Sequence, residues 1–151
     1  MNKPEFEPIF TAGFHTIDLS QLESLFVTNF ENNSKRQILV NQLRNFLDEL
    51  SKINSNIEIW LDGSFTTLKI EPEDIDILIV YNNISINSLP DEQKIIVKSL
   101  FDRNITKIRY SIDILLCADD DENNRSYWRG WFGFSRSENP KGIAKFSYGN
   151  N

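Results

Sequence analysis

Hydrophobic positions recur at helical spacing in three segments of the chain. Residues 18–27 and 34–51 carry leucine, isoleucine and phenylalanine side chains three or four positions apart, and 90–104 repeats the pattern after a proline. This period places the apolar side chains on one face of a helix. We therefore predict three amphipathic helices, with a loop over residues 82–88 before the third.

Three other segments are nearly continuous apolar runs, and they span residues 57–62, 74–81 and 108–117. Runs of this kind are typical of strands that are covered on both faces. The order helix, helix, strand, strand, helix, strand then predicts an α/β (α+β) fold. We expect a small mixed β-sheet with helices packed mainly on one side, in a single domain over residues 1–151.

The two ends of the chain differ from this pattern. Residues 1–17 contain prolines and scattered aromatics and predict an extended N-terminal arm, whereas 126–148 form an aromatic and basic C-terminal segment. Its aromatic side chains could stack on a nucleobase while its basic side chains contact phosphates. We favour core packing, because a domain of this size needs the buried area. The side chains concerned are Trp128, Trp131, Phe134, Arg129, Arg136 and Lys141.

Composition narrows the class of protein. A chain of 151 residues with 40% hydrophobic residues matches one globular domain, and its net charge of −6 argues against extended DNA binding, which requires a basic surface. The single cysteine, Cys117, excludes an intramolecular disulfide and predicts a buried thiol. No run is as long as a membrane span and the N-terminus lacks a signal-peptide pattern, so we expect a cytoplasmic protein without membrane partners.

Three aspartates lie within the predicted strands. Asp74 and Asp76 open the second strand on one face of it, where like charges repel unless a cation lies between them. Asp113 lies inside the third strand, where an unpaired charge would cost several kcal/mol. Mg²⁺ prefers such carboxylates together with phosphate oxygens. The acids therefore predict one metal site if the strands are neighbours; for Asp113, an ion pair with Lys107 or Arg109 is the competing interpretation.

Gly63-Ser64 precedes Asp74-Ile75-Asp76, and Asp113 follows on its own strand. This series resembles the nucleotidyltransferase superfamily of the DNA polymerase β type over residues 57–116, and the short length is similar to its minimal members. The whole layout also resembles short uncharacterised prokaryotic nucleotidyltransferase-like proteins. The further matching segments are Gly13-Phe14-His15, Trp60-Leu61-Asp62-Gly63-Ser64-Phe65 and Lys141-Gly142-Ile143.

The resemblance implies a nucleotidyltransferase-like fold and a two-metal reaction. Asp74, Asp76 and Asp113 would be the catalytic residues and would bind two Mg²⁺ ions, with Mn²⁺ as an alternative. Gly63 would turn beside the triphosphate of an NTP such as ATP, and Ser64 and Thr66 would bind its phosphates. The enzyme would move a nucleoside monophosphate onto a hydroxyl of a protein or RNA acceptor. Phe65 departs from the Gly or Arg found in minimal members and is expected to pack.

Two alternatives lie outside catalysis by this chain alone. The resemblance also covers antitoxins, so the protein could be a binding module that neutralises a partner protein, as in a toxin–antitoxin pair. A role in antiviral defence against phage is a further alternative. We interpret Asp62 as a turn former rather than a fourth acid of the site, and the single histidine, His15, as structural.

Overall fold

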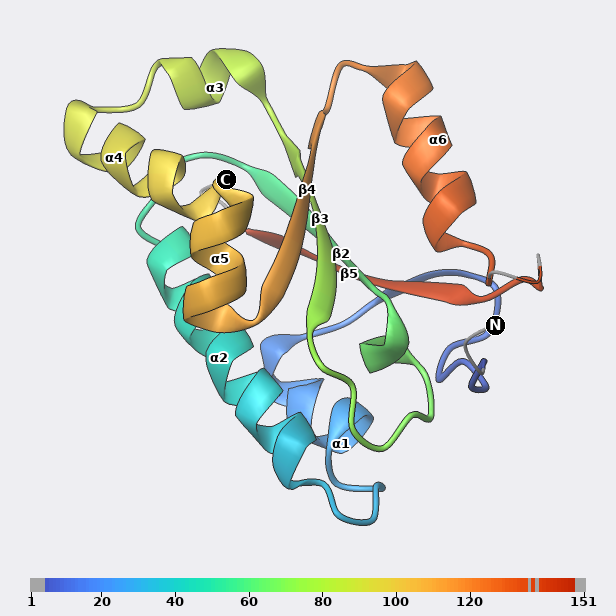
Figure 1. Cartoon of the computed structure of the whole chain (residues 1–151). Coiled ribbons are helices and arrows are strands. Elements are labelled where there is room, and N and C mark those ends of the chain that lie inside the picture. Colours follow the sequence, from blue (N-terminus) through green and yellow to red (C-terminus); the bar gives the residue numbers. More distant parts are fainter. Residues whose placement is uncertain (1–4, 136, 138, 149–151) are drawn as a thin grey trace.

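Five strands form one mixed sheet in the order β1-β5-β2-β3-β4. The computed structural model in Figure 1 describes residues 5–135, 137 and 139–148. Strand β2 is antiparallel to β5 and β3, whereas β4 is parallel to β3 and β1 is parallel to β5. This arrangement confirms the predicted α+β fold with a mixed sheet. The strands are β1 (Gly13–Thr16), β2 (Ile57–Asp62), β3 (Ile75–Tyr81), β4 (Ile112–Ala118) and β5 (Gly142–Tyr148).

The helices confirm the three predicted segments and add others; the third segment, 90–104, contains α4, which ends at Leu100. The predicted helix over 34–51 is α2, which spans Ser34–Leu50, and the segment 18–27 forms a short 3₁₀ turn followed by α1. None of the described helices is long and apolar enough to cross a membrane. The remaining bounds are η1 (Leu19–Gln21), α1 (Leu22–Phe26), η2 (Ser64–Thr66), α3 (Asn83–Asn87), α4 (Asp91–Leu100), α5 (Arg103–Tyr110) and α6 (Glu122–Phe132).

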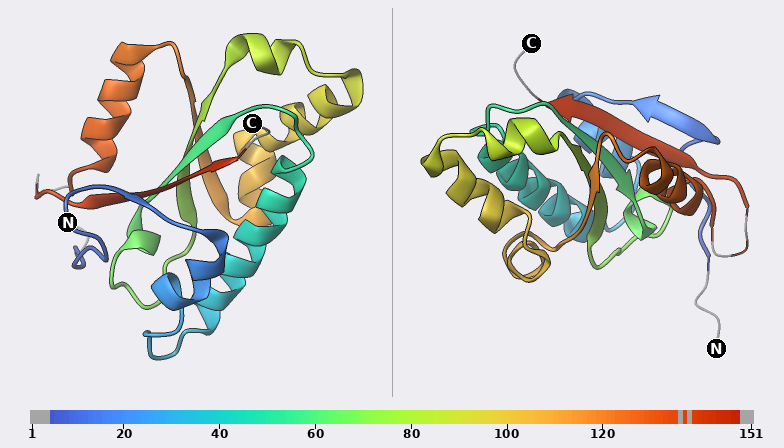
Figure 2. Two further views of the ribbon diagram at one scale, coloured as in Figure 1. Left: turned by 180° about the vertical axis from the view of Figure 1, so that it is seen from behind. Right: turned by 90° about the horizontal axis from the view of Figure 1, so that it is seen from above.

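The sheet has a helix-rich face and a second face covered by α6. Alternate residues of β2 and β3 face helices α1, α2, α4 and α5 in the larger core, while the residues between them form a smaller core with α6. Figure 2 shows α6 on the opposite side of the sheet from α2 and α5. Helices therefore lie mainly on one side, as predicted. The smaller core consists of Trp60, Leu78, Val80, Cys117, Phe132 and Ile143, with Leu115 and Trp128 packed against it.

The predicted strand over 108–117 begins too early. Residues up to Tyr110 belong to α5. Asp102 caps the start of this helix, because its side chain accepts a hydrogen bond from the backbone N–H of Ile105. Ser111 then takes a left-handed conformation with φ of 56°, which ends the helix before β4. Ile108 caused the error, because this apolar side chain is 86% exposed on α5 and belongs to no strand.

Two other segments also differ from the prediction. The expected loop over 82–88 contains α3, whose first turn is capped by the side chain of Asn82 accepting from the Ser85 N–H at 2.8 Å. The C-terminal segment contains most of α6 and then β5, which pairs with the N-terminal arm through β1. Pairing between the two ends of the chain depends on contacts distant in sequence, so no local pattern reveals it.

Candidate active site

The predicted acids gather at one end of the sheet. Asp76 is the direct register partner of Asp113 on the parallel strand β4, and Asp74 lies immediately before β3. On the other side of Asp76, its antiparallel register partner is Asp62 at the end of β2. Because register partners share a face, Asp62, Asp76 and Asp113 lie side by side on the face covered by α6. Tertiary structure thus unites the three acids that the sequence singled out and adds a fourth.

The interpretation of Asp62 as a turn former is wrong, because this residue ends strand β2 beside Asp76. Its side chain is only 7% exposed, and it forms an ion pair with Lys141, whose Nζ lies 2.7 Å from its Oδ1 atom. Burial raises the pKa of Asp62 to about 7, and the charge of Lys141 opposes that rise. Strand alternation puts Asp62 on the same face of β2 as Trp60, and the sequence shows this much. Only the pairing of β2 with β3 shows that this face also carries Asp76.

Asp76 carries the strongest crowding of negative charge. Burial first, and then the neighbouring charges of Asp74 and Asp113, raise the pKa of Asp76 to about 6. Two cations nearby, Lys107 and Lys141, lower it but do not offset the other effects. A further cation beside Asp76 would relieve this repulsion, so the site favours cation binding.

Helix α5 supplies two cations to the acids. Arg103 Nη2 donates to Asp113 Oδ1 at 2.8 Å, and Lys107, one turn further along the same face of the helix, pairs with Asp74. The hydrogen bond to Asp74 raises the pKa of Lys107. Asp113 does form an ion pair, as the competing interpretation held, but its partner is Arg103 rather than Lys107 or Arg109.

The acids fit a hard divalent cation in chemistry, although not with α5 in its present position. Among the described residues, no three carboxylate, imidazole or thiol groups stand ready to hold a metal ion. Oxygen ligands alone match Mg²⁺ or Mn²⁺. A metal between Asp74 and Asp113 would have to displace Lys107 and Arg103, whose side chains are 52% and 63% exposed and so have room to turn into solvent. The carboxylates therefore suit Mg²⁺ or Mn²⁺, and Arg103 and Lys107 of α5 compete with a metal ion for them.

The Gly-Ser turn touches this acid cluster. Gly63 has φ of 79°, and a Cβ atom there would collide with the carboxylate of Asp76, so this position requires glycine. Phe65 is fully buried, as predicted. Thr66 is also buried, and its hydroxyl donates to the Gly63 carbonyl at 3.1 Å. Ser64 is partly exposed, and its hydroxyl makes no hydrogen bond to the residues that the structure describes, so it is the side chain of the turn available for a phosphate.

A buried arginine that sequence reasoning missed fixes the segment after this turn. Arg36 lies fully buried on α2, and burial lowers its pKa to about 10. All its N–H groups donate to backbone carbonyls, at distances of 2.6–3.1 Å. No local pattern distinguishes it from an exposed helical arginine. The accepting residues are Phe26, Phe65, Thr67 and Lys69.

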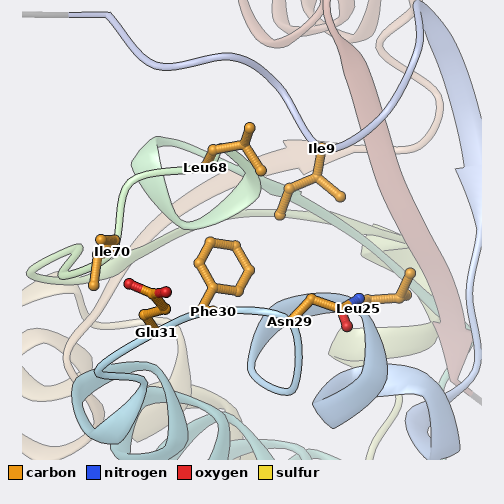
Figure 3. A pocket seen from close by; sticks show the side chains of 7 residues that line it. All are labelled: Ile9, Leu25, Asn29, Phe30, Glu31, Leu68 and Ile70. Atoms are coloured by element: carbon orange, nitrogen blue, oxygen red, sulfur yellow. The ribbon is translucent and has the colours of Figure 1, made fainter.

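The same segment also borders an apolar hollow of about 350 Å³, shown in Figure 3. None of the four acids lines it, and the one charged side chain at its wall is Glu31. Phe30 projects into it and also lies beneath the guanidinium of Arg36, 3.8 Å from ring centroid to Cζ. We assign no chemistry to this hollow. Its lining residues are Ile9, Leu25, Asn29, Phe30, Glu31, Leu68 and Ile70.

The aromatic and basic C-terminal segment divides in the structure. Trp128 packs against the smaller core, as predicted, whereas Trp131 and Phe134 are 63% and 47% exposed and do not. Lys141 binds the acid cluster. Arg136 lies outside the described residues. The segment therefore supplies both core and surface.

The fold and site define an α+β protein with a mixed five-stranded sheet and a carboxylate cluster beside a Gly-Ser turn. The chain belongs to a family of unknown function, DUF6932, which matches residues 4–147. No curated protein matches the chain, and no solved structure does.

Proposed function

We propose that this protein is a Mg²⁺-dependent nucleotidyltransferase that moves a nucleoside monophosphate from an NTP to a hydroxyl group. The observation that carries the proposal is the convergence of Asp74, Asp76 and Asp113 beside a turn that only Gly63 can form. Divalent cations held by these carboxylates would neutralise the triphosphate and activate the acceptor hydroxyl. The acceptor hydroxyl belongs to RNA or to a protein.

The residues of the chain then take separate roles. Ser64 donates its hydroxyl to a phosphate oxygen of the NTP, and Asp113 takes the proton of the acceptor hydroxyl. The acceptor oxygen forms a bond to the α-phosphorus while the bond from that phosphorus to the bridging oxygen breaks, and pyrophosphate leaves. Lys107 and Arg103, once released from the acids, lie close enough to the site to pair with the departing phosphates.

Transfer of radiolabel tests this function directly. Purified protein is incubated with α-³²P-labelled NTPs, Mg²⁺ and a mixture of RNA and protein acceptors. We expect Asp76→Ala to lower label incorporation about 100- to 10,000-fold, because removal of a metal-binding carboxylate removes several kcal/mol of transition-state stabilisation. Asp91→Ala, at the exposed start of α4, is the control and should keep full activity. Full labelling by Asp76→Ala would disprove the proposal.

One observation favours a second candidate, a binding module that neutralises a partner protein. The α5 cations already compensate Asp74 and Asp113, so these acids are electrostatically satisfied without a metal. Mn²⁺ titration calorimetry separates the two functions. A catalytic site should bind Mn²⁺, and more tightly in Lys107→Ala, where a competing cation is gone. A binding module should bind none in either protein.

A further inference from the structure

A second charged region lies on the α6 face of the sheet, and its charge is opposite to that of the acid cluster. A hollow of about 220 Å³ lies between α6 and strands β1, β2 and β5. Figure 1 shows α6 standing over this side of the sheet. Three cationic side chains and one carboxylate surround it. The lining residues are Phe14, Glu58, Trp60, Arg125, Ser126, Arg129 and Lys145.

The single carboxylate of the hollow does not neutralise its arginines. Glu58 Oε1 accepts a hydrogen bond from Trp60 Nε1 at 2.6 Å and lies 3.7 Å from Lys145 Nζ. Within the part of the chain that the structure describes, neither Arg125 nor Arg129 forms an ion pair. The hollow therefore carries three cationic side chains against one carboxylate, although the net charge of the protein is −6. They create a local positive potential that attracts an anion.

Aromatic surface lies directly beside these cations. The ring of Phe14 is 37% exposed, and it packs edge-on against Trp60 with a centroid distance of 4.9 Å. Lys145 Nζ lies 4.7 Å from the centroid of Phe14. Guanidinium groups bind phosphate oxygens through paired hydrogen bonds, and a nucleobase can stack on an exposed aromatic ring. The combination fits a phosphate attached to a nucleobase better than it fits an inorganic anion.

We propose that this hollow binds a nucleotide, with the phosphate between Arg125 and Arg129 and the base against Phe14. Trp60 precedes Asp62 by two residues on the same face of β2, so the hollow begins about 7 Å along the strand from the acid cluster. This distance is within the length of one nucleotide. If the proposed function holds, on which this step rests, the bound nucleotide is the acceptor, and its hydroxyl reaches the acids. The acceptor is then a free nucleotide or the end of an RNA, not a protein side chain.

Calorimetry in EDTA tests the hollow without any contribution from metal. The probes are inorganic phosphate, AMP and a hexa-adenylate RNA. We expect AMP to bind at least about tenfold more tightly than phosphate, because the aromatic wall adds stacking. Arg125→Glu/Arg129→Glu should weaken AMP binding by at least about tenfold. Lys94→Glu/Lys98→Glu, at two exposed positions of α4 across the sheet, is the matched double charge reversal and should leave the affinity unchanged within about twofold.

A second variant keeps the test independent of the arginines. Phe14→Ala should weaken AMP but not phosphate, and a thermal melt shows whether either variant remains folded. AMP binding that is absent from the wild type, or equal in the charge-reversed variant, would overturn the proposal, and so would phosphate binding as tight as AMP. Tighter binding of the RNA than of AMP would identify an RNA end as the ligand, and equal binding would identify a free nucleotide.

The outcome also separates this inference from the proposed function. AMP binding should persist in Asp76→Ala, which lowers transfer strongly but leaves the hollow intact. AMP binding without any NTP-dependent labelling would retain the nucleotide site and disprove nucleotidyl transfer. Labelling of a protein acceptor by a wild type that does not bind AMP would retain transfer and overturn the nucleotide acceptor.

Discussion

The two faces of the sheet differ in what they bury. The helix-rich face carries apolar side chains from every covering helix, together with the fully satisfied guanidinium of Arg36. The α6 face has an apolar patch in its middle, a carboxylate cluster at one end and a cationic hollow beside it. Strand β3 serves both, because Ile75 and Ile77 enter the larger core while Asp76 faces the acid cluster.

Strand β3 therefore contributes to stability with one face and to the candidate site with the other. Full burial of each isoleucine or leucine contributes about 1.5–3 kcal/mol. Burial of Asp62 and Asp76 works against folding, as their raised pKa values indicate. We infer that the helix-rich face supplies the stability that offsets the crowded acids. Loss of the buried Arg36 on the helix-rich face and loss of the Asp76 charge on the α6 face should therefore have opposite effects on stability.

Loss of Arg36 should have the largest effect on stability. Arg36→Met would leave backbone carbonyls of Phe26, Phe65, Thr67 and Lys69 without their donor, so we expect the free energy of unfolding to fall by about 3–5 kcal/mol. Urea denaturation measures this change. Arg109→Met, at an exposed position of α5, should change it by less than about 0.5 kcal/mol. Equal effects of the two variants would show that the buried hydrogen bonds of Arg36 add no stability to the helix-rich face.

Gly63→Ala should have the next largest effect, because the new methyl group meets the Asp76 carboxylate at a strained φ of 79°. We expect a loss of about 2–4 kcal/mol in the free energy of unfolding. Gly130→Ala on α6 is the control; its Cβ has open space, so it should stabilise the protein by about 0.4–1 kcal/mol.

A double-mutant cycle locates the source of the Gly63→Ala effect. In an Asp76→Ala background the carboxylate contacts at 2.3 and 2.9 Å are removed and only the Cβ contact at 3.2 Å remains, so Gly63→Ala should cost much less than in the wild type. Additive effects of the two substitutions would show that the turn and the acid cluster do not touch.

Asp76→Asn should give the smallest effect, with the opposite sign. The pKa of Asp76 is about 6 in the folded protein against its ordinary value of 3.8, so the charged form lowers stability as the pH rises from about 4, and the loss is complete above about pH 6. We expect Asp76→Asn to stabilise the protein by about 1–3 kcal/mol at pH 8 in EDTA. The gain should shrink as the pH falls through 6 and vanish near pH 4.

Thermal melts of both proteins between pH 4 and 8 measure this dependence on pH. Asp91→Asn, at an exposed site, is the control and should show no such dependence. If Asp76→Asn is less stable than the wild type at pH 8, neighbouring groups already stabilise the charged Asp76. The charge repulsion that favours a bound cation would then be absent.

Sequence patterns predicted helix α2 and strand β2 more reliably than helix α5, which supplies the cations of the acid cluster. Helix α2 and strand β2 follow directly from unbroken periodicity, and their bounds agree with the prediction to within a residue. Helix α5 was hidden because its exposed Ile108 extends the apolar run of β4. That error concealed Arg103 as the partner of Asp113, and it assigned Lys107 to Asp113 rather than to Asp74.

The sequence by itself determined strands β2 and β3, the Gly-Ser turn and the candidate acids Asp74, Asp76 and Asp113, because each depends on local spacing. Only the tertiary structure decided that Asp62 joins them, that α5 compensates two of the acids, and that Arg125 and Arg129 share a hollow with Phe14. These relations depend on strand order and on where α6 packs. Such contacts link positions far apart in the chain, and their energies come from packing and charge rather than from local periodicity.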